Sequence, residues 1–207
     1  MLRVLGKASS INVRKVLWAC DEIGLAYIRE DWGSGYRSTS SAEFQALNPN
    51  AMVPVLVDGD IVLWESNVIV RYLAAKHERH DLLPVTAAER ARVEMWMDWQ
   101  ASDFNNSWRY AFQALVRKNP ACQGAAELAA SVKDWTRNIA IIEAQLGKTG
   151  SYIASAGFTV ADVAIGLAVN RWFMTPLAHP PFAAVAAYFE RLSERPAFRL
   201  HGRNGTP

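Results

Sequence analysis

The chain has 207 residues, of which 51% are hydrophobic, and its 22 basic and 20 acidic residues give a net charge of +2. A nucleic-acid-binding protein needs its basic residues clustered on one face, whereas no run of basic residues here exceeds two. No segment approaches the roughly 18 consecutive apolar residues of a membrane span, and no signal-peptide pattern follows the N-terminus. We therefore expect a cytoplasmic protein that has neither nucleic-acid nor membrane partners.

Residues 1–31 combine strand and helix patterns. Val4-Leu5 is typical of a short apolar strand, and Gly24 stands where a helix would end. Residues 25–31 then return to a strand pattern. Between them, apolar residues recur at the spacing of one helix face, namely Val13, Val16, Leu17, Cys20 and Ile23. This stretch predicts a strand–helix–strand unit.

The next stretch predicts a short helix around residues 43–47, then a hairpin, then a third helix. Two strand-like runs flank Asp58-Gly59, which favours a type I′ turn because both residue types tolerate positive φ. The third helix is expected to open at Glu65 and to end near Lys76. The order βαβ–α–ββα predicts one small mixed sheet with helices packed on it.

The remaining residues have helical patterns almost throughout. Residues 76–84 are polar and end in Pro84, which is typical of a linker, and the linker is placed at residues 79–85. We therefore predict an α/β domain at residues 1–78 and an all-helical domain at residues 86–207.

Two capping boxes are predicted in the helical part, at Thr86/Glu89 and at Thr159/Asp162, because each pair has the Ncap-to-N3 spacing. A long helix is expected to begin near residue 87, with another helix at about residues 108–116. The last helix is expected to end near Pro196. Residues 201–207 are polar and are expected to be frayed.

Three polar stretches fall at the ends of predicted elements in the first domain. Ser10-Ile11-Asn12 joins the first strand to the first helix, Val53-Pro54 precedes a strand, and Glu65-Ser66 begins a helix. In an open α/β sheet such connections gather at one edge, where ligands tend to bind. The sequence therefore predicts a binding site at this edge.

Together with their neighbours, these stretches resemble the cytosolic glutathione transferases, most closely the theta-, phi- and beta-like bacterial and plant branches that use a serine. The resemblance covers essentially the whole chain. It implies a thioredoxin-like N-terminal domain, a C-terminal helical bundle, and a homodimer. It also implies glutathione as co-substrate, a small electrophile as second substrate, and no metal. The matching runs are residues 10–17, 48–56, 65–73 and 158–162.

For the glutathione sulfur, the resemblance implies a hydrogen bond from Ser10, with Asn12 as a second donor. The adjacent Ser9 is an alternative to Ser10, and a helix-start role is an alternative for both Ser10 and Asn12. A free thiol has a pKa of about 8.5. A hydroxyl donor and the positive end of a helix both favour its thiolate form.

The rest of the glutathione molecule is assigned by the same resemblance. Val53-Pro54 is expected to have a cis peptide bond, so that the Val53 backbone pairs with the cysteinyl part. Glu65 is expected to bind the γ-glutamyl ammonium group. The hydroxyl of Ser66 and the helix-start N–H groups are expected to bind the γ-glutamyl carboxylate.

The glycyl carboxylate has no evident partner in the sequence. Met52 stands where family members often have a polar or basic residue, and Thr39-Ser40 stands where many have basic residues. Arg37 is the nearest candidate, although it is displaced from the usual position.

Aromatic residues of the helical domain supply the candidate second-substrate site. Trp108 is the principal candidate, and Phe104, Tyr110 and Phe112 belong to the same region. By contrast, Trp96 and Trp99 are interpreted as packing residues.

The cysteines and histidines predict no chemistry of their own. Cys20 lies on an apolar helix face and is expected to be a buried hydrophobe, and Cys122 lies in a loop. No cysteine occurs in the Ser9–Asn12 loop, which disfavours a cysteine mechanism. The four histidines are too scattered to form a metal site.

The predicted function is therefore a glutathione transferase that activates the thiol and conjugates it to a small electrophile. Two alternatives stay open. One is a glutathione-dependent disulfide or peroxide reductase on the same fold. The other is a non-catalytic interaction module, since a fold alone does not determine function.

Overall fold

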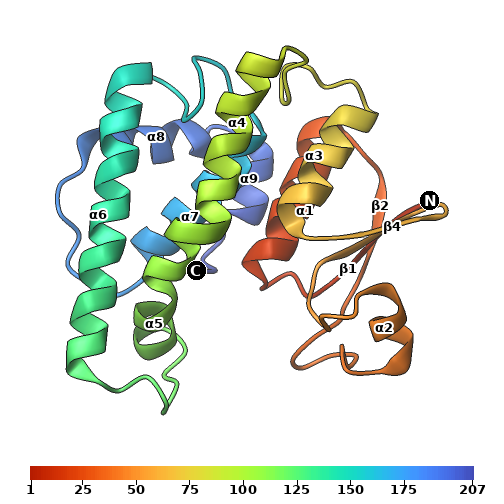
Figure 1. Ribbon diagram of the computed structural model, residues 1–207, viewed down its shortest axis with the longest axis horizontal. Helices are drawn as coiled ribbons and strands as arrows, with labels where there is room; N and C mark the ends of the chain where they lie inside the picture. The colour runs from red at the N-terminus through yellow and green to blue at the C-terminus, as the bar shows by residue number, and fades with distance from the viewer.

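The computed structural model describes all 207 residues and places a four-stranded sheet beside a group of helices (Figure 1). The sheet order is β2-β1-β3-β4. β1 pairs in parallel with β2, whereas the pairs β1–β3 and β3–β4 are antiparallel. The predicted mixed sheet is confirmed. The strands are β1 (Leu2–Leu5), β2 (Tyr27–Glu30), β3 (Val55–Asp58) and β4 (Ile61–Trp64).

Nine α-helices complete the fold, and none of them is long and apolar enough to cross a membrane. Helices α1 and α3 lie between the sheet and the C-terminal helices (Figure 1). The helices are α1 (Ile11–Ile23), α2 (Ala42–Leu47), α3 (Ser66–Lys76), α4 (Ala87–Trp99), α5 (Asn105–Leu115), α6 (Ala125–Thr149), α7 (Val160–Met174), α8 (Ala183–Ser193) and α9 (Pro196–His201).

The two faces of the sheet bury different clusters, because successive side chains of a strand point to opposite faces. Val4 of β1 joins a cluster formed with α1 and α3. Leu5, the next residue, packs with Trp32 and with Phe44 of α2. Alternation along one four-residue strand thus fixes which helices cover which face.

Helix α1 is buried against both the sheet and the C-terminal helices. Its residues from Val13 to Cys20 are all buried. On the side away from the sheet, the Trp18 ring lies 5.7 Å from the ring of Phe158 and 4.8 Å from that of Phe198. Both contacts belong to a core cluster of 35 residues that includes residues of α1 and α3. The two predicted domains therefore share a core.

The predicted domain boundary falls in the loop between α3 and α4. The polar character expected of this linker is wrong for two residues, because Leu82 and Leu83 are only 2% and 3% exposed and belong to the large core cluster. The connection is therefore anchored to the helical part. The boundary itself stays a prediction.

The predicted hairpin is confirmed, but its turn type is wrong. Asp58 pairs with Ile61, so the two-residue loop is Gly59-Asp60, one residue later than expected. Gly59 has a φ of 60°, whereas Asp60 is not among the residues with positive φ. Positive φ at the first loop residue alone is the pattern of a type II′ turn. Gly59 therefore determines the turn type from the first position of the loop, whereas the sequence pattern predicts it at the second.

The helices around residues 87–99 and 105–115 are continuous with each other, which the sequence pattern does not predict. They are joined by a π-helical segment, η1 (Gln100–Phe104). Such segments change the face that the following turns present, and they occur often at functional sites. Phe104 ends fully buried in the core.

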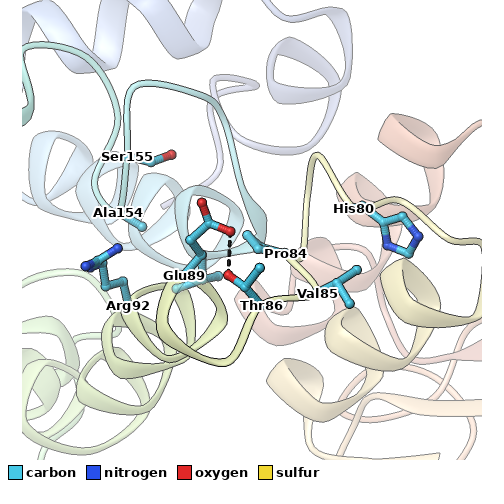
Figure 2. Close-up of a pocket in the computed structure, with 9 residues that line it drawn as sticks. His80, Pro84, Val85, Thr86, Glu89, Arg92, Ala154 and Ser155 are labelled. Atoms are coloured by element: carbon cyan, nitrogen blue, oxygen red, sulfur yellow. Dashed lines mark hydrogen bonds between the residues drawn. The ribbon is translucent and has the colours of Figure 1, made fainter.

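Of the two predicted capping boxes, only the second is formed. Thr86 makes no side-chain cap. Its hydroxyl instead donates to Glu89 Oε2 at 2.5 Å (Figure 2). Asp162 accepts a hydrogen bond of 2.8 Å from the backbone N–H of Thr159 at the start of α7, as its box requires. Thr86 and Glu89 therefore form one exposed hydrogen bond between side chains, whereas Thr159 and Asp162 form a buried cap at the start of α7.

The end of the chain is docked, not frayed as predicted. The stretch after Arg195 forms α9, with Pro196 at a position that tolerates proline because its missing N–H needs no partner. Arg14 of α1, which is 1% exposed, donates to the carbonyl oxygens of Thr206 at 2.8 Å and Pro207 at 2.6 Å. A buried guanidinium requires acceptors, and the backbone of the tail supplies them.

Asp162→Ala is expected to lower the free energy of unfolding by about 3 kcal/mol or more, because several buried donors lose their acceptor. Besides Thr159, its carboxylate accepts from the Ile153 N–H and the Tyr188 hydroxyl, both at 2.9 Å. Urea denaturation followed by tryptophan fluorescence measures the change. Asp134→Ala on the exposed face of α6 is the control, with an expected change within about 0.5 kcal/mol. Equal losses in both variants would contradict this role.

Candidate functional site

The three polar stretches meet at one end of the sheet. Asn12 at the start of α1, Val53 and Pro54 before β3, and Glu65 and Ser66 at the start of α3 line one cavity of about 280 Å³. The lining is completed by Asn48, Asn50 and Met52. Five of the six residues predicted to hold glutathione and its sulfur thus share one cavity, and Ser10 is the exception.

A second, smaller cavity adjoins the first. It has a volume of about 100 Å³ and shares Asn12, Glu65 and Ser66 with its neighbour. Its lining is otherwise polar except for one alanine, and it includes residues of η1 and α5. The additional lining residues are Lys15, Asn67, Gln100, Ala101 and Asn105.

The peptide bond between Val53 and Pro54 is cis, as predicted. Neither the N–H nor the C=O group of Val53 takes part in a backbone hydrogen bond. Extended peptides bind to such free backbone groups by adding a strand-like ladder. The loop before β3 therefore offers one donor and one acceptor to an extended ligand.

Glu65 has a φ of 70°, which the sequence does not reveal. A non-glycine residue in this region costs about 1–3 kcal/mol. Ser66, which follows it, is 6% exposed, and its hydroxyl donates to Asn12 Oδ1 at 3.4 Å. The first turn of a helix has N–H groups without intrahelical partners. Glu65 and the start of α3 therefore offer a carboxylate and several donors at the same place.

Ser10 is the N-cap residue of α1, yet its hydroxyl forms no cap hydrogen bond. It is half-buried and lines neither cavity, whereas Asn12 lines both. Ser9 is exposed. The structure thus brings Asn12 to the cavities, and it leaves the Ser10 hydroxyl without the bond that a purely structural cap would make.

The loop before Val53 is held by Asn48, a residue to which the sequence analysis gave no role. The Asn48 amide donates to the Met52 carbonyl at 2.7 Å, and its oxygen accepts from the Asn50 N–H at 3.0 Å. Asparagine side chains commonly stabilise turns by such local bonds. The Asn-Pro-Asn run is the signal that predicts this turn.

Arg37 is not brought to the site. It forms two hydrogen bonds of 3.0 Å to Glu43, and its guanidinium lies 3.8 Å from the ring centroid of Trp32. Met52 lines the cavity with an exposed side chain. The predicted gap at the glycyl end is therefore not closed by Arg37.

Trp108 is also not brought to the cavities. It is 7% exposed, and the guanidinium of Arg171 lies 4.4 Å from its ring centroid. Phe104 and Phe112 are buried in the same core cluster. Trp96 and Trp99 pack edge to face at 5.4 Å, which agrees with the packing role predicted for them.

Cys20 is fully buried, and burial raises the pKa of its thiol to about 12. Such a thiol stays protonated and unreactive at neutral pH. The structural role predicted for this residue agrees with its place in the core.

Lys15 is the site residue that sequence reasoning missed. It is 3% exposed, and its ammonium donates to Gln100 Oε1 at 2.6 Å and to Asn67 Oδ1 at 3.1 Å. Asn67 in turn donates to the Met97 carbonyl at 2.7 Å. Burial lowers the pKa of Lys15 to about 7. The signal in the sequence is the pair Arg14-Lys15 between the apolar residues Val13 and Val16 of a helix.

Another cavity, of about 450 Å³, lies over the α3–α4 connection and the start of α4 (Figure 2). Its lining includes His80, Thr86, Glu89 and Arg92. None of the predicted site residues lines it. Its size therefore does not make it the better candidate.

The known proteins that are similar to this chain share one family. A family model described as "Glutathione S-transferase, N-terminal domain" matches residues 1–75. Over 201 residues the chain is 36% identical to glutathione S-transferase GstB of Escherichia coli K12, covering 96% of each chain. It is also 36% identical to glutathione S-transferase 3 of Zea mays, covering 96% of this chain and 91% of the maize protein.

The chain belongs to the glutathione S-transferase family. Among solved structures of the family, a theta class glutathione S-transferase from Xanthomonas axonopodis pv. citri with glutathione bound superposes with a TM-score of 0.90. It is 36% identical, and the match covers 97% of this chain and 96% of that one. The thioredoxin-like and helical parts expected of a glutathione S-transferase are thus confirmed at the level of the whole fold.

Proposed function

We propose that this chain is a glutathione transferase that binds glutathione in the 280 Å³ cavity, stabilises its thiolate, and transfers it to a small electrophile. One observation carries the proposal. Asn12, Val53, Pro54, Glu65 and Ser66 come from three separated stretches of the sequence, and they line the same cavity. Family membership and the glutathione-bound relative support the same activity.

The cavity offers complementary groups for two parts of glutathione. The free backbone groups of Val53 can pair with the cysteinyl residue, and Glu65 can pair with the γ-glutamyl ammonium. Ser66 and the N–H groups at the start of α3 provide donors for the γ-glutamyl carboxylate. This arrangement would direct the sulfur toward the start of α1.

At the start of α1, Ser10 is proposed as the donor to the sulfur. Its hydroxyl is not used in a cap hydrogen bond, and the N-terminus of a helix favours an anion. A serine hydroxyl is too weak an acid to act as a base here, so it stabilises the thiolate as a donor. The thiolate then attacks the electrophilic carbon and forms a C–S bond. With a halide the carbon–halogen bond breaks and halide leaves, with an epoxide the C–O bond breaks and the alkoxide takes a proton from water, and with an activated alkene the π electrons move to the neighbouring carbon, which takes a proton from water.

A second candidate function is a glutathione-dependent disulfide or peroxide reductase. The observation that favours it is the position of Asn12, which lines both cavities while Ser10 lines neither. A panel of halides, epoxides, activated alkenes, disulfides and peroxides assayed with glutathione separates the two functions. Conjugation products support the transferase, and formation of oxidised glutathione supports the reductase.

We further propose that the protein is a cytoplasmic homodimer with domains at residues 1–78 and 86–207, as its family resemblance implies. A pure interaction module has no need to keep Ser10, Glu65 and Ser66 together, which argues against that alternative. Sedimentation equilibrium tests the dimer. Failure to bind glutathione at millimolar concentration would favour the interaction module.

Ser10→Ala is expected to raise the pKa of the bound glutathione thiol by about 1–2 units, because one hydrogen bond to a charged group contributes about 1.5–3 kcal/mol. The measurement is the ultraviolet absorbance of the thiolate as a function of pH in the binary complex. Asn12→Ala and Ser9→Ala are measured in parallel. An unchanged titration in Ser10→Ala, together with a shift in Asn12→Ala, would transfer the role to Asn12.

Glu65→Gln is expected to raise the KM for glutathione about 10- to 100-fold while kcat changes less, because it removes an ion pair made to the bound ligand. Steady-state kinetics at saturating second substrate give both constants. Glu89→Gln, in the cavity of Figure 2, is the matched control and should leave KM unchanged. A similar rise in both variants would argue against the assignment.

A further inference from the structure

The charges around the two adjoining cavities are unevenly distributed. Glutathione carries two carboxylates at neutral pH, yet the 280 Å³ cavity is lined by no basic residue. Lys15 is the only basic residue that lines either cavity, and it does so in the smaller one behind Ser66. Lys15 is therefore the one cation that these two cavities present to a ligand carboxylate.

Lys15 lacks a carboxylate partner within the protein. Its ammonium donates to two amide oxygens, those of Asn67 and Gln100. An ammonium has three N–H donors, so one is left over. A buried charge is stabilised by an opposite charge and costs free energy without one. The side chain is thus held in place by neutral acceptors, and the charge of Glu65 acts on it without a hydrogen bond between the two.

The position of Lys15 is set by three elements that meet at the cavity. Lys15 itself is on α1, Asn67 is in the first turn of α3, and Gln100 opens the π-helical segment η1. Gln100 is 2% exposed and Asn67 is 7% exposed, so the ammonium is enclosed on these sides. The open side is the 100 Å³ cavity that it shares with Ser66 and Asn105.

We propose that Lys15 receives the α-carboxylate of the γ-glutamyl residue in the smaller cavity, so that this lysine gains its counter-ion only when glutathione is bound. The inference rests on the proposed function and adds a charge-pairing residue to it. Ser66 supplies a hydroxyl to the same carboxylate, and Glu65 faces the neighbouring ammonium of the ligand.

Proton uptake should accompany this pairing. In the free protein, burial and the charge of Arg171 on α7 lower the pKa of Lys15, and Glu65 beside α3 opposes them. Arg14, the neighbour of Lys15 on α1, bonds to the tail. A bound carboxylate raises the pKa again. Binding therefore takes up a proton above about pH 7, and affinity falls as pH rises.

The test uses S-methylglutathione, which has no titratable thiol. Isothermal titration calorimetry of the full-length protein is performed between about pH 6 and pH 8.5 in two buffers of different ionisation enthalpy. The wild type should take up protons in the upper part of this range. Lys15→Met should take up markedly fewer, whereas Lys133→Met, on the exposed face of α6, should behave as the wild type.

A second ligand tests the contact between Lys15 and the α-carboxylate separately from the rest of the binding site. In this analogue the α-carboxylate of S-methylglutathione is replaced by hydrogen. The wild type should bind it at least about 10-fold more weakly than the parent ligand, and Lys15→Met should discriminate several-fold less. A lysine that only braces α1, α3 and η1 would lower affinity for both ligands equally.

The outcomes are distinguishable. Equal discrimination between the two ligands by the wild type and by Lys15→Met overturns the role of Lys15 and leaves the proposed function intact. Failure of the wild type to bind S-methylglutathione at all overturns both. If Lys15→Met does not fold, Lys15→Gln replaces it in the same comparison of the two ligands, and wild-type-like discrimination by that variant overturns the role of Lys15.

Discussion

Helix α1 is buried from Val13 to Cys20, and two adjacent cations, Arg14 and Lys15, are buried with it. The rest of the structure depends on how these charges are accommodated. Arg14 is satisfied by backbone carbonyls at the end of the chain, and Lys15 by two amides at the edge of the site. Neither forms a hydrogen bond to an Asp or Glu side chain. The same helix therefore binds the C-terminal residues through Arg14 and places the buried cation of Lys15 at the candidate site.

Much of the fold can be predicted from the sequence, because it depends on local patterns. The spacing of Val13, Val16 and Leu17 predicts the sheet-facing side of α1, and the Asp-Gly pair predicts the hairpin. The patterns do not show what covers the side of α1 that faces away from the sheet, although that side is buried as well. The docking of residues 201–207 depends on Arg14, which is 187 or more positions away in sequence. The π-helical segment likewise has no local signature.

The candidate site also contains residues that local sequence patterns predict and residues that they do not. The sequence predicts Val53, Glu65 and Ser66 because they lie in short runs that resemble a family. The site also contains Lys15, Asn67 and Gln100, whose polar groups matter only because three elements meet there. Arg37 shows the opposite case: a suitable residue type near the expected position is already paired with Glu43 and stacked on Trp32. Partners of this kind are decided by tertiary contacts, which single-sequence patterns do not contain.

The backbone of Glu65 has a consequence for how this protein can change. Its φ of 70° is one that glycine adopts without a steric penalty, whereas glutamate does not. Selection for thermal stability therefore favours glycine at position 65, whereas selection for ligand binding favours glutamate. A directed-evolution experiment that selects for heat resistance alone would replace Glu65 by glycine and so remove the carboxylate. The thermostable variant would keep the fold and lose affinity for glutathione.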